Sequence, residues 1–115
     1  MVIIEDYAFG EITIDGKKYR EDVIVFPDHV IEGWYRSEEH SLTIEDLWEA
    51  LEYNPKILVI GTGYSGRLDV PSNIVFELEK KGIRVIVQNT KNAVEVFNKY
   101  VKENKRIVAV LHITC

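Results

Sequence analysis

The chain has 115 residues, 46% of them hydrophobic, and a formal net charge of −5 at pH 7. This length suits one domain, residues 1–115, and so high an apolar content excludes a disordered chain. The negative charge argues against nucleic-acid binding, which depends on clustered lysine and arginine. No apolar run approaches the ~20 residues that cross a bilayer, so we expect no membrane partner and a soluble, cytoplasmic protein.

The first half of the chain opens with a predicted β-hairpin. Asp15-Gly16 is a two-residue turn signal between alternating apolar and polar residues. A turn at this point pairs Ile12 with Tyr19 and places both side chains on one face.

A strand and a helix follow the hairpin. Residues 22–26 are rich in β-branched side chains and end at Pro27-Asp28, whereas residues 28–42 have no regular pattern. Thr43 is a suitable N-cap for a helix that ends before Asn54-Pro55. The apolar face of this helix is expected to consist of Ile44, Leu47, Trp48 and Leu51.

The second half alternates between strand and helix. Its predicted strands are 57–60, 83–87 and 106–113, and its predicted helices are 71–81 and 91–104. Thr90 is expected to cap the second of these helices, on which Asn98 is expected to be a buried side chain that bonds backbone. The last strand is apolar on both faces, which predicts a central position in the sheet. The pattern indicates an α/β fold with a β-rich N-terminal addition.

The loop Gly61–Gly66 is the most informative segment, because glycines between a strand and a helix allow tight turns and close approach. A right-handed crossover makes strands 57–60 and 83–87 parallel, so this loop and the turn 88–90 should face one crevice. Two helix N-termini directed at the crevice would favour an anion. The candidate ligand-binding residues are Gly61, Thr62, Gly63, Ser65, Arg67 and Thr90, with Arg36 and His40 as secondary candidates.

The glycine spacing matches G-x-G-x-x-G, but its context does not fit a dinucleotide. Residues 67–71 separate the third glycine from the helix, and the next strand ends in Gln88-Asn89 without an acid for the ribose. We therefore expect no cofactor. The histidines are scattered and Cys115 is the only cysteine, so we expect neither a metal site nor a disulfide. His112, in the last strand, is expected to be a hydrogen-bonded core residue.

No catalytic residue is assigned. Ser65 is not in a nucleophile-elbow pattern, and no nucleophile–base pair is evident. Whether the protein is an enzyme is left open by the sequence, which favours a non-enzymatic role.

Similarity to a known family is carried by residues spread over almost the whole chain: Trp34, His40-Ser41-Leu42, Asp46-Leu47, Ile60-Gly61-Thr62-Gly63, Thr90, Ala93, Phe97-Asn98, Arg106 and Leu111-His112. They resemble a family of small domains of unknown function from archaea and bacteria. That family also includes the mitochondrial respiratory complex I assembly factor 3 and the adipogenesis-associated domain-containing protein. The strand-Gly-Thr-Gly element and the Thr-x-x-Ala-x-x-x-Phe-Asn helix are its most specific parts.

The resemblance implies a three-layer fold with a central mixed five-stranded sheet and an additional N-terminal β layer. It also implies that the last strand runs antiparallel to the others. The family's biochemistry is largely unassigned, with a protein-assembly role in one branch.

Two functional hypotheses follow. The first is a binding or assembly-type module with a glycine-lined crevice, whose partner is an unknown protein or a small anion. The second is a small-molecule enzyme or sensor for an anionic or carboxylate ligand in that crevice. The chain is expected to be a monomer or a weak homodimer, with the hairpin's edge strands and Tyr35 as a contact surface.

Overall fold

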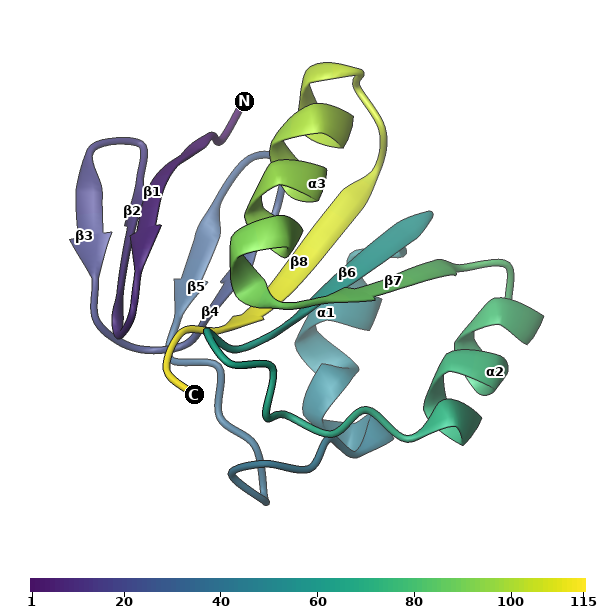
Figure 1. Ribbon diagram of the computed structural model, residues 1–115. Helices are drawn as coiled ribbons and strands as arrows, with labels where there is room; N and C mark the ends of the chain where they lie inside the picture. The colour runs from purple at the N-terminus through teal and green to yellow at the C-terminus, as the bar shows by residue number, and fades with distance from the viewer.

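The computed structural model describes residues 1–115, which form two sheets and three α-helices (Figure 1). The elements in chain order are β1 (Ile4–Ala8), β2 (Glu11–Ile14), β3 (Lys17–Tyr19), β4 (Val23–Val25), β5 (Val30–Glu32), the 3₁₀ helix η1 (Ile44–Leu47), α1 (Trp48–Glu52), β6 (Ile57–Thr62), α2 (Ser72–Lys80), β7 (Arg84–Gln88), α3 (Thr90–Lys102) and β8 (Ile107–His112). Strands β1–β3 form a small sheet, and the other five form a mixed sheet in the order β5-β4-β8-β6-β7.

The three-layer α/β fold and the additional N-terminal β layer are confirmed. Helices α1 and α2 pack on one face of the five-stranded sheet, and α3 together with the β1–β3 sheet packs on the other. Figure 1 shows β1–β3 at one side of the molecule and α3 lying across the sheet. The central sheet is therefore covered on both faces, as its apolar strands require.

The predicted hairpin is also confirmed. Asp15 (φ 48°) and Gly16 (φ 81°) both have positive φ, as a two-residue turn with right-handed strand twist needs. Ile12 pairs with Tyr19, and both side chains are buried.

The two central strands account for most of the core. All six residues of β6 and all six of β8 are buried. Val59 and Ala109 face α3, whereas Leu58 and Val108 face α1 and α2. The central position predicted for the last strand is thus correct, and both faces of that strand contribute to the core.

The predicted direction of the last strand is wrong. β8 runs parallel to β6, with Ile57 beside Ile107 and Thr62 beside His112, and only β4 runs antiparallel to it. Helix α3 explains this direction. Its 13 residues extend ~20 Å, which returns the chain to the starting edge of the sheet after β7 and makes the next strand parallel.

Three local expectations also differ from the structure. Trp48 is 59% exposed rather than part of the core. The preceding turn is a 3₁₀ helix, whose three residues per turn shift the apolar face away from the α-helical spacing. Strands β1 and β5 were not expected from the sequence. Both depend on pairing with a neighbour, β2 for the first and β4 for the second.

Candidate functional site

The glycine loop closes directly onto the start of α3. The Gly63 N–H donates to Oγ1 of Thr90 at 2.9 Å, and the Thr90 N–H donates to the Gly63 carbonyl at 3.1 Å. The Thr90 hydroxyl in turn donates to the His112 carbonyl at 2.5 Å. Thr90 is fully buried. Through these bonds its hydroxyl connects the end of β6, the start of α3 and the end of β8.

Thr90 is not the helix cap that the sequence suggests. Asn89 is the N-cap of α3, and its side chain accepts a hydrogen bond from the Asn92 N–H at 3.0 Å. Thr90 is the first helical residue, and its hydroxyl is used for the contacts with the loop and β8 instead. Both residue types are good caps, so the pattern alone cannot distinguish them.

Two of the loop glycines are required by close packing, as predicted. Gly63 has φ 108°, and a Cβ there would lie 2.4 Å from the Cys115 carbonyl carbon. At Gly61, a Cβ would lie 2.8 Å from Leu111 Cδ2 and 2.9 Å from Thr90 Oγ1. A side chain at either position would displace a neighbour.

The rest of the loop is bonded to the last residues of the chain. The Tyr64 N–H donates to the Thr114 carbonyl at 2.6 Å, and the Arg67 N–H donates to the Cys115 carbonyl at 3.0 Å. The Thr62 hydroxyl donates to the Gln88 carbonyl at 3.1 Å. Several of the N–H groups considered for an anion therefore already have acceptors within the chain.

No hollow opens over the candidate residues. The surface has four hollows, and none is lined by Gly61–Arg67, Thr90, Arg36 or His40. The start of α2 faces a different hollow, where Pro71 and Asn73 lie opposite residues 42–44. The structure brings Gly61, Thr62, Gly63 and Thr90 together. It leaves Ser65 and Arg67 exposed at the surface.

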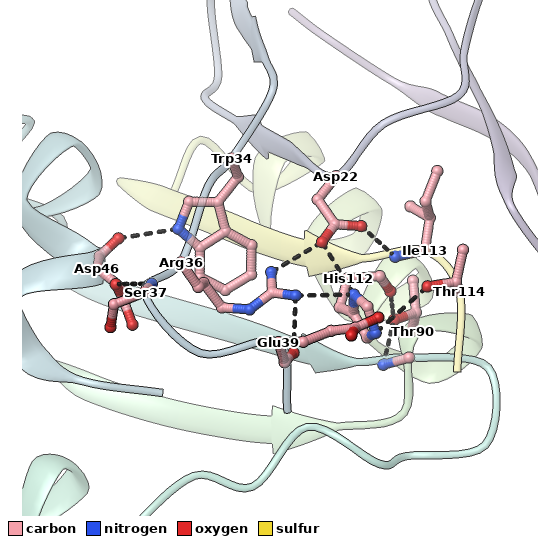
Figure 2. Close-up of polar contacts among 11 residues, drawn as sticks. Asp22, Trp34, Arg36, Ser37, Glu39, Asp46, Thr90, His112, Ile113 and Thr114 are labelled. Atoms are coloured by element: carbon pink, nitrogen blue, oxygen red, sulfur yellow. Dashed lines mark hydrogen bonds and ion pairs between the residues drawn. The ribbon is translucent and has the colours of Figure 1, made fainter. Parts of the chain in front are cut away.

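A buried charged network lies at the C-terminal end of β8, next to this loop (Figure 2). Arg36 Nη1 donates to Asp22 Oδ2 at 2.8 Å, and the Ile113 N–H donates to Asp22 Oδ1 at 2.8 Å. His112 Nδ1 lies 2.9 Å from Asp22 Oδ2. The network joins the residue before β4, the segment after β5 and the end of β8.

Arg36 is held on several sides. Its side chain is only 5% exposed, its Nη2 donates to the Glu39 carbonyl at 3.1 Å, and its guanidinium lies 4.7 Å from the centre of the Trp34 ring. Its Nε is buried and has no hydrogen-bond partner. Figure 2 shows the guanidinium between Asp22, Glu39 and His112.

The electrostatics of the network favour an ionised Asp22. Burial by itself raises the pKa of Asp22. The bonds from His112, the Ile113 N–H and Arg36 outweigh burial, so the pKa lies below its ordinary value of 3.8. His112 Nδ1 lies near both Asp22 and Arg36 Nη2, and it donates to the carboxylate in the tautomer that carries a proton on Nδ1. The network therefore fits a structural link between segments of the chain better than an open reaction site.

The structure thus places both secondary candidates near β8. Arg36 contacts His112, and the exposed ring of His40 lies edge-on to the His112 ring, with 6.2 Å between ring centres. His112 is 2% exposed, which confirms the expected core histidine. Asp22 was not among the residues predicted from the sequence. The one feature of the sequence that could have indicated Asp22 is that this acidic residue directly precedes a run of β-branched residues, Val23–Val25, which is buried in the structure.

Exposed aromatic side chains gather beside the same loop. Tyr64 at the loop tip is 59% exposed and meets Phe9, 57% exposed, edge to face with 6.0 Å between ring centres. The ring centres of Tyr7 and Tyr64 are 6.4 Å apart, and the Tyr7 hydroxyl donates to the Ile113 carbonyl at 2.9 Å. Partial burial raises the pKa of Tyr7 to about 12, so this hydroxyl stays protonated. We call Tyr7, Phe9 and Tyr64 the aromatic surface.

Side chains that could ligate a metal do not cluster. No group of three or more His, Cys, Asp or Glu residues is placed to hold an ion. None of the helices is both long and apolar enough to pass through a bilayer.

Comparison with known proteins gives the family. The model of a family described as "Protein of unknown function (DUF498/DUF598)" matches residues 4–112. The chain belongs to this family. The match includes the glycine loop, Asp22, Arg36 and His112, and it ends just before the last three residues, which bond to the loop and to Asp22.

Relatives of the DUF498 domain are known from vertebrates and archaea. The chain is 33% identical over 113 residues to NADH dehydrogenase [ubiquinone] 1 alpha subcomplex assembly factor 3 of Xenopus tropicalis, covering 96% of this chain and 60% of that protein. It is 31% identical to the Danio rerio protein of the same name, covering 93% of this chain and 61% of that protein. The chain therefore spans about three fifths of these curated relatives' length.

A solved structure has the same fold over nearly its full length. The conserved hypothetical protein of Pyrococcus horikoshii OT3 is 30% identical and superposes with a TM-score of 0.82. The alignment covers 97% of this chain and 98% of that one.

Proposed function

We propose that this DUF498 domain is a protein-binding module of the assembly type and that its contact region includes the aromatic surface. The relatives named as assembly factors support a role in which the domain binds other proteins. This chain covers only about three fifths of those relatives. The proposal therefore concerns the domain and not a particular respiratory complex.

One observation carries the proposal. The glycine loop is bonded within the chain and presents Tyr64 outward against Phe9, which comes from a turn 55 positions earlier in the sequence. Partly exposed aromatic side chains held on a rigid support are typical of protein interfaces, where they supply much of the binding energy. A site for a small molecule would instead need a hollow lined by convergent polar groups.

The test uses the full chain, tagged and expressed in cells of its source organism. A double variant, Phe9→Ser with Tyr64→Ser, removes the apolar contact while leaving the buried network intact. Phe76→Ser is the matched control, because Phe76 is 64% exposed on α2. Figure 1 places α2 on the opposite side of the molecule from the β1–β2 turn.

We expect proteins that co-purify with the wild type and with Phe76→Ser to be lost from the double variant. All three chains should retain the same melting temperature, because the changed side chains are exposed. Identical co-purifying proteins for the double variant and the wild type would contradict the proposal.

The alternative is a small-molecule enzyme or sensor for an anion or carboxylate at Gly61, Thr62, Gly63, Ser65, Arg67 and Thr90. The unpartnered Nε of Arg36 is the observation that favours it, since a buried cationic donor is a potential anion contact. An anion would have to replace the bonds from the loop to Thr114 and Cys115.

A thermal-shift panel tests this alternative with phosphate, sulfate, citrate, nucleotides and short carboxylates. A bound anion raises the melting temperature by mass action. Arg67→Ala should then abolish the shift, and Lys80→Ala, at the far end of α2, should keep it. No shift at millimolar concentration would contradict the anion site and leave the protein-binding proposal standing.

A further inference from the structure

Strand β7 is an open edge of the five-stranded sheet. It pairs with β6 on one side, and no strand follows it in the sheet order. It is longer than β5, the strand at the opposite edge, with five residues against three. Its centre is Val85-Ile86-Val87, and Val87 is 38% exposed although it is aliphatic. The strand contains no proline, lysine or bulge, the devices that usually protect a sheet edge.

The hydrogen bonds show which backbone groups of β7 are free. The Arg84 N–H donates to the Lys56 carbonyl, directly before β6, and the Gln88 carbonyl accepts from the Thr62 side chain in β6. Backbone groups of successive residues in a strand point to opposite sides. Arg84, Ile86 and Gln88 therefore direct their groups at β6, and Val85 and Val87 direct theirs away from the sheet.

We propose that β7 pairs antiparallel with β7 of a second copy of this chain, about a two-fold axis at Ile86. This register sets Val85 opposite Val87 of the second copy, and the reverse. The outward-facing N–H and C=O groups of Val85 and Val87 then meet those of Val87 and Val85 in the second copy. Each of the two pairs forms two N–H···O bonds, which gives four in all. A shift by two residues in one direction would use Ile83, whose N–H already donates to Leu78. A shift in the other direction would use Asn89, the cap of α3.

Side-chain chemistry also favours a second copy. Arg84 is the only charged residue of β7, and the proposed register sets it opposite Gln88. The two Arg84 residues are then four positions apart along the strands, about 13 Å, which exceeds the screening length of about 8 Å at physiological ionic strength. On one face of the extended sheet, the valines of each copy cover those of the other.

The direct test measures association and amide exchange on the same wild-type samples. Sedimentation velocity from micromolar to millimolar concentration should show a weak monomer–dimer equilibrium, because a five-residue strand pair buries a small area. In the dimer, the Val85 and Val87 amides should exchange more slowly with solvent. Exchange at β3, an edge strand of the small sheet, should not depend on concentration.

Variants at Val87 separate edge pairing from other modes of association. Val87→Pro removes an outward N–H without touching the bonds to β6, so it should weaken dimerisation by at least about tenfold. Val87→Thr keeps the N–H and the β-branched shape, and should dimerise like the wild type. If the proline variant does not fold, Val87→Lys replaces it, because a charge at this exposed position also opposes pairing.

Two results would overturn the proposal: a chain that is monomeric at millimolar concentration, or a dimer in which Val85 and Val87 exchange as in the monomer. The Phe9→Ser, Tyr64→Ser variant should dimerise normally. Failure of the edge pairing is therefore distinguishable from failure of the proposed partner surface.

Discussion

At the scale of single residues, Gly63 shows how tightly the loop is closed. Gly63→Ala combines positive φ with a Cβ placed 2.4 Å from backbone, so we expect a loss of about 3 kcal/mol in the free energy of unfolding. Gly82 also has positive φ, 87°, but has no atom within 4 Å of its Cβ position. Gly82→Ala should therefore cost only about 1 kcal/mol. Equal losses in urea denaturation would contradict the close packing described for Gly63.

Asp22 gives a prediction that depends on pH. Asp22→Asn leaves the buried Arg36 without its counter-charge and should cost about 3 kcal/mol at pH 7. Because the folded pKa lies below 3.8, the stabilisation by Asp22 is present above that pH and is lost as the pH falls through the folded pKa. The stabilities of the two proteins should therefore converge in acid. A constant difference from pH 7 to pH 2 would exclude this linkage.

The sequence predicts some of these residues and not others, for a physical reason. The close packing at Gly63 and the buried state of His112 follow from local pattern, glycines after a strand and a histidine in an apolar run. The contact between Asp22 and His112 joins residues 90 positions apart, and such pairing leaves no periodic signal in the chain. Asn98 illustrates both cases. Its side chain bonds backbone as predicted, but the backbone is that of Ile4, which lies 94 positions earlier in the sequence.

At the scale of elements, the start of α3 can be tested by its cap. Asn89→Ala removes the acceptor for the Asn92 N–H and should destabilise the protein by about 1 kcal/mol. Asn92→Ala is the control, because that exposed side chain is not the cap and should change stability by less than about 0.5 kcal/mol. The measurement is the chemical-denaturation midpoint of each variant. A loss in Asn92→Ala as large as that in Asn89→Ala would contradict the assignment of the cap.

Elements with strong internal patterns are predictable from the sequence, and those that depend on partners are not. Helices α2 and α3 and strands β6, β7 and β8 lie within a few residues of their expected positions because amphipathic spacing and apolar runs define them. Strand β1 carries Glu5 and Asp6 in its middle and is held in place by β2. The direction of β8 came from the resemblance and is wrong, whereas the length of α3 accounts for the parallel arrangement.

At the scale of the whole molecule, the end of the sheet that would hold a ligand in many α/β proteins is closed. The last residues of the chain cover the glycine loop, and the charged network fixes the segment after β5 beside it. The sequence predicts a crevice at the ends of β6 and β7, whereas the bonds that close the glycine loop come from Thr114 and Cys115, whose positions no local pattern specifies. The proposed protein-binding role therefore places the contact on a surface rather than in a crevice, with the aromatic surface as its exposed apolar part.

Site-specific photo-crosslinking tests this claim most directly. A benzophenone amino acid replaces Tyr64 in one sample and Phe76 in another, each in the full chain inside cells of the source organism. Both positions are exposed aromatics, at 59% and 64%, so they are matched in reach to solvent. We predict discrete crosslinks to a small set of proteins from position 64, competed by untagged wild-type chain, and none of these from position 76. The same crosslinked proteins from both positions, or none from position 64, would contradict the account.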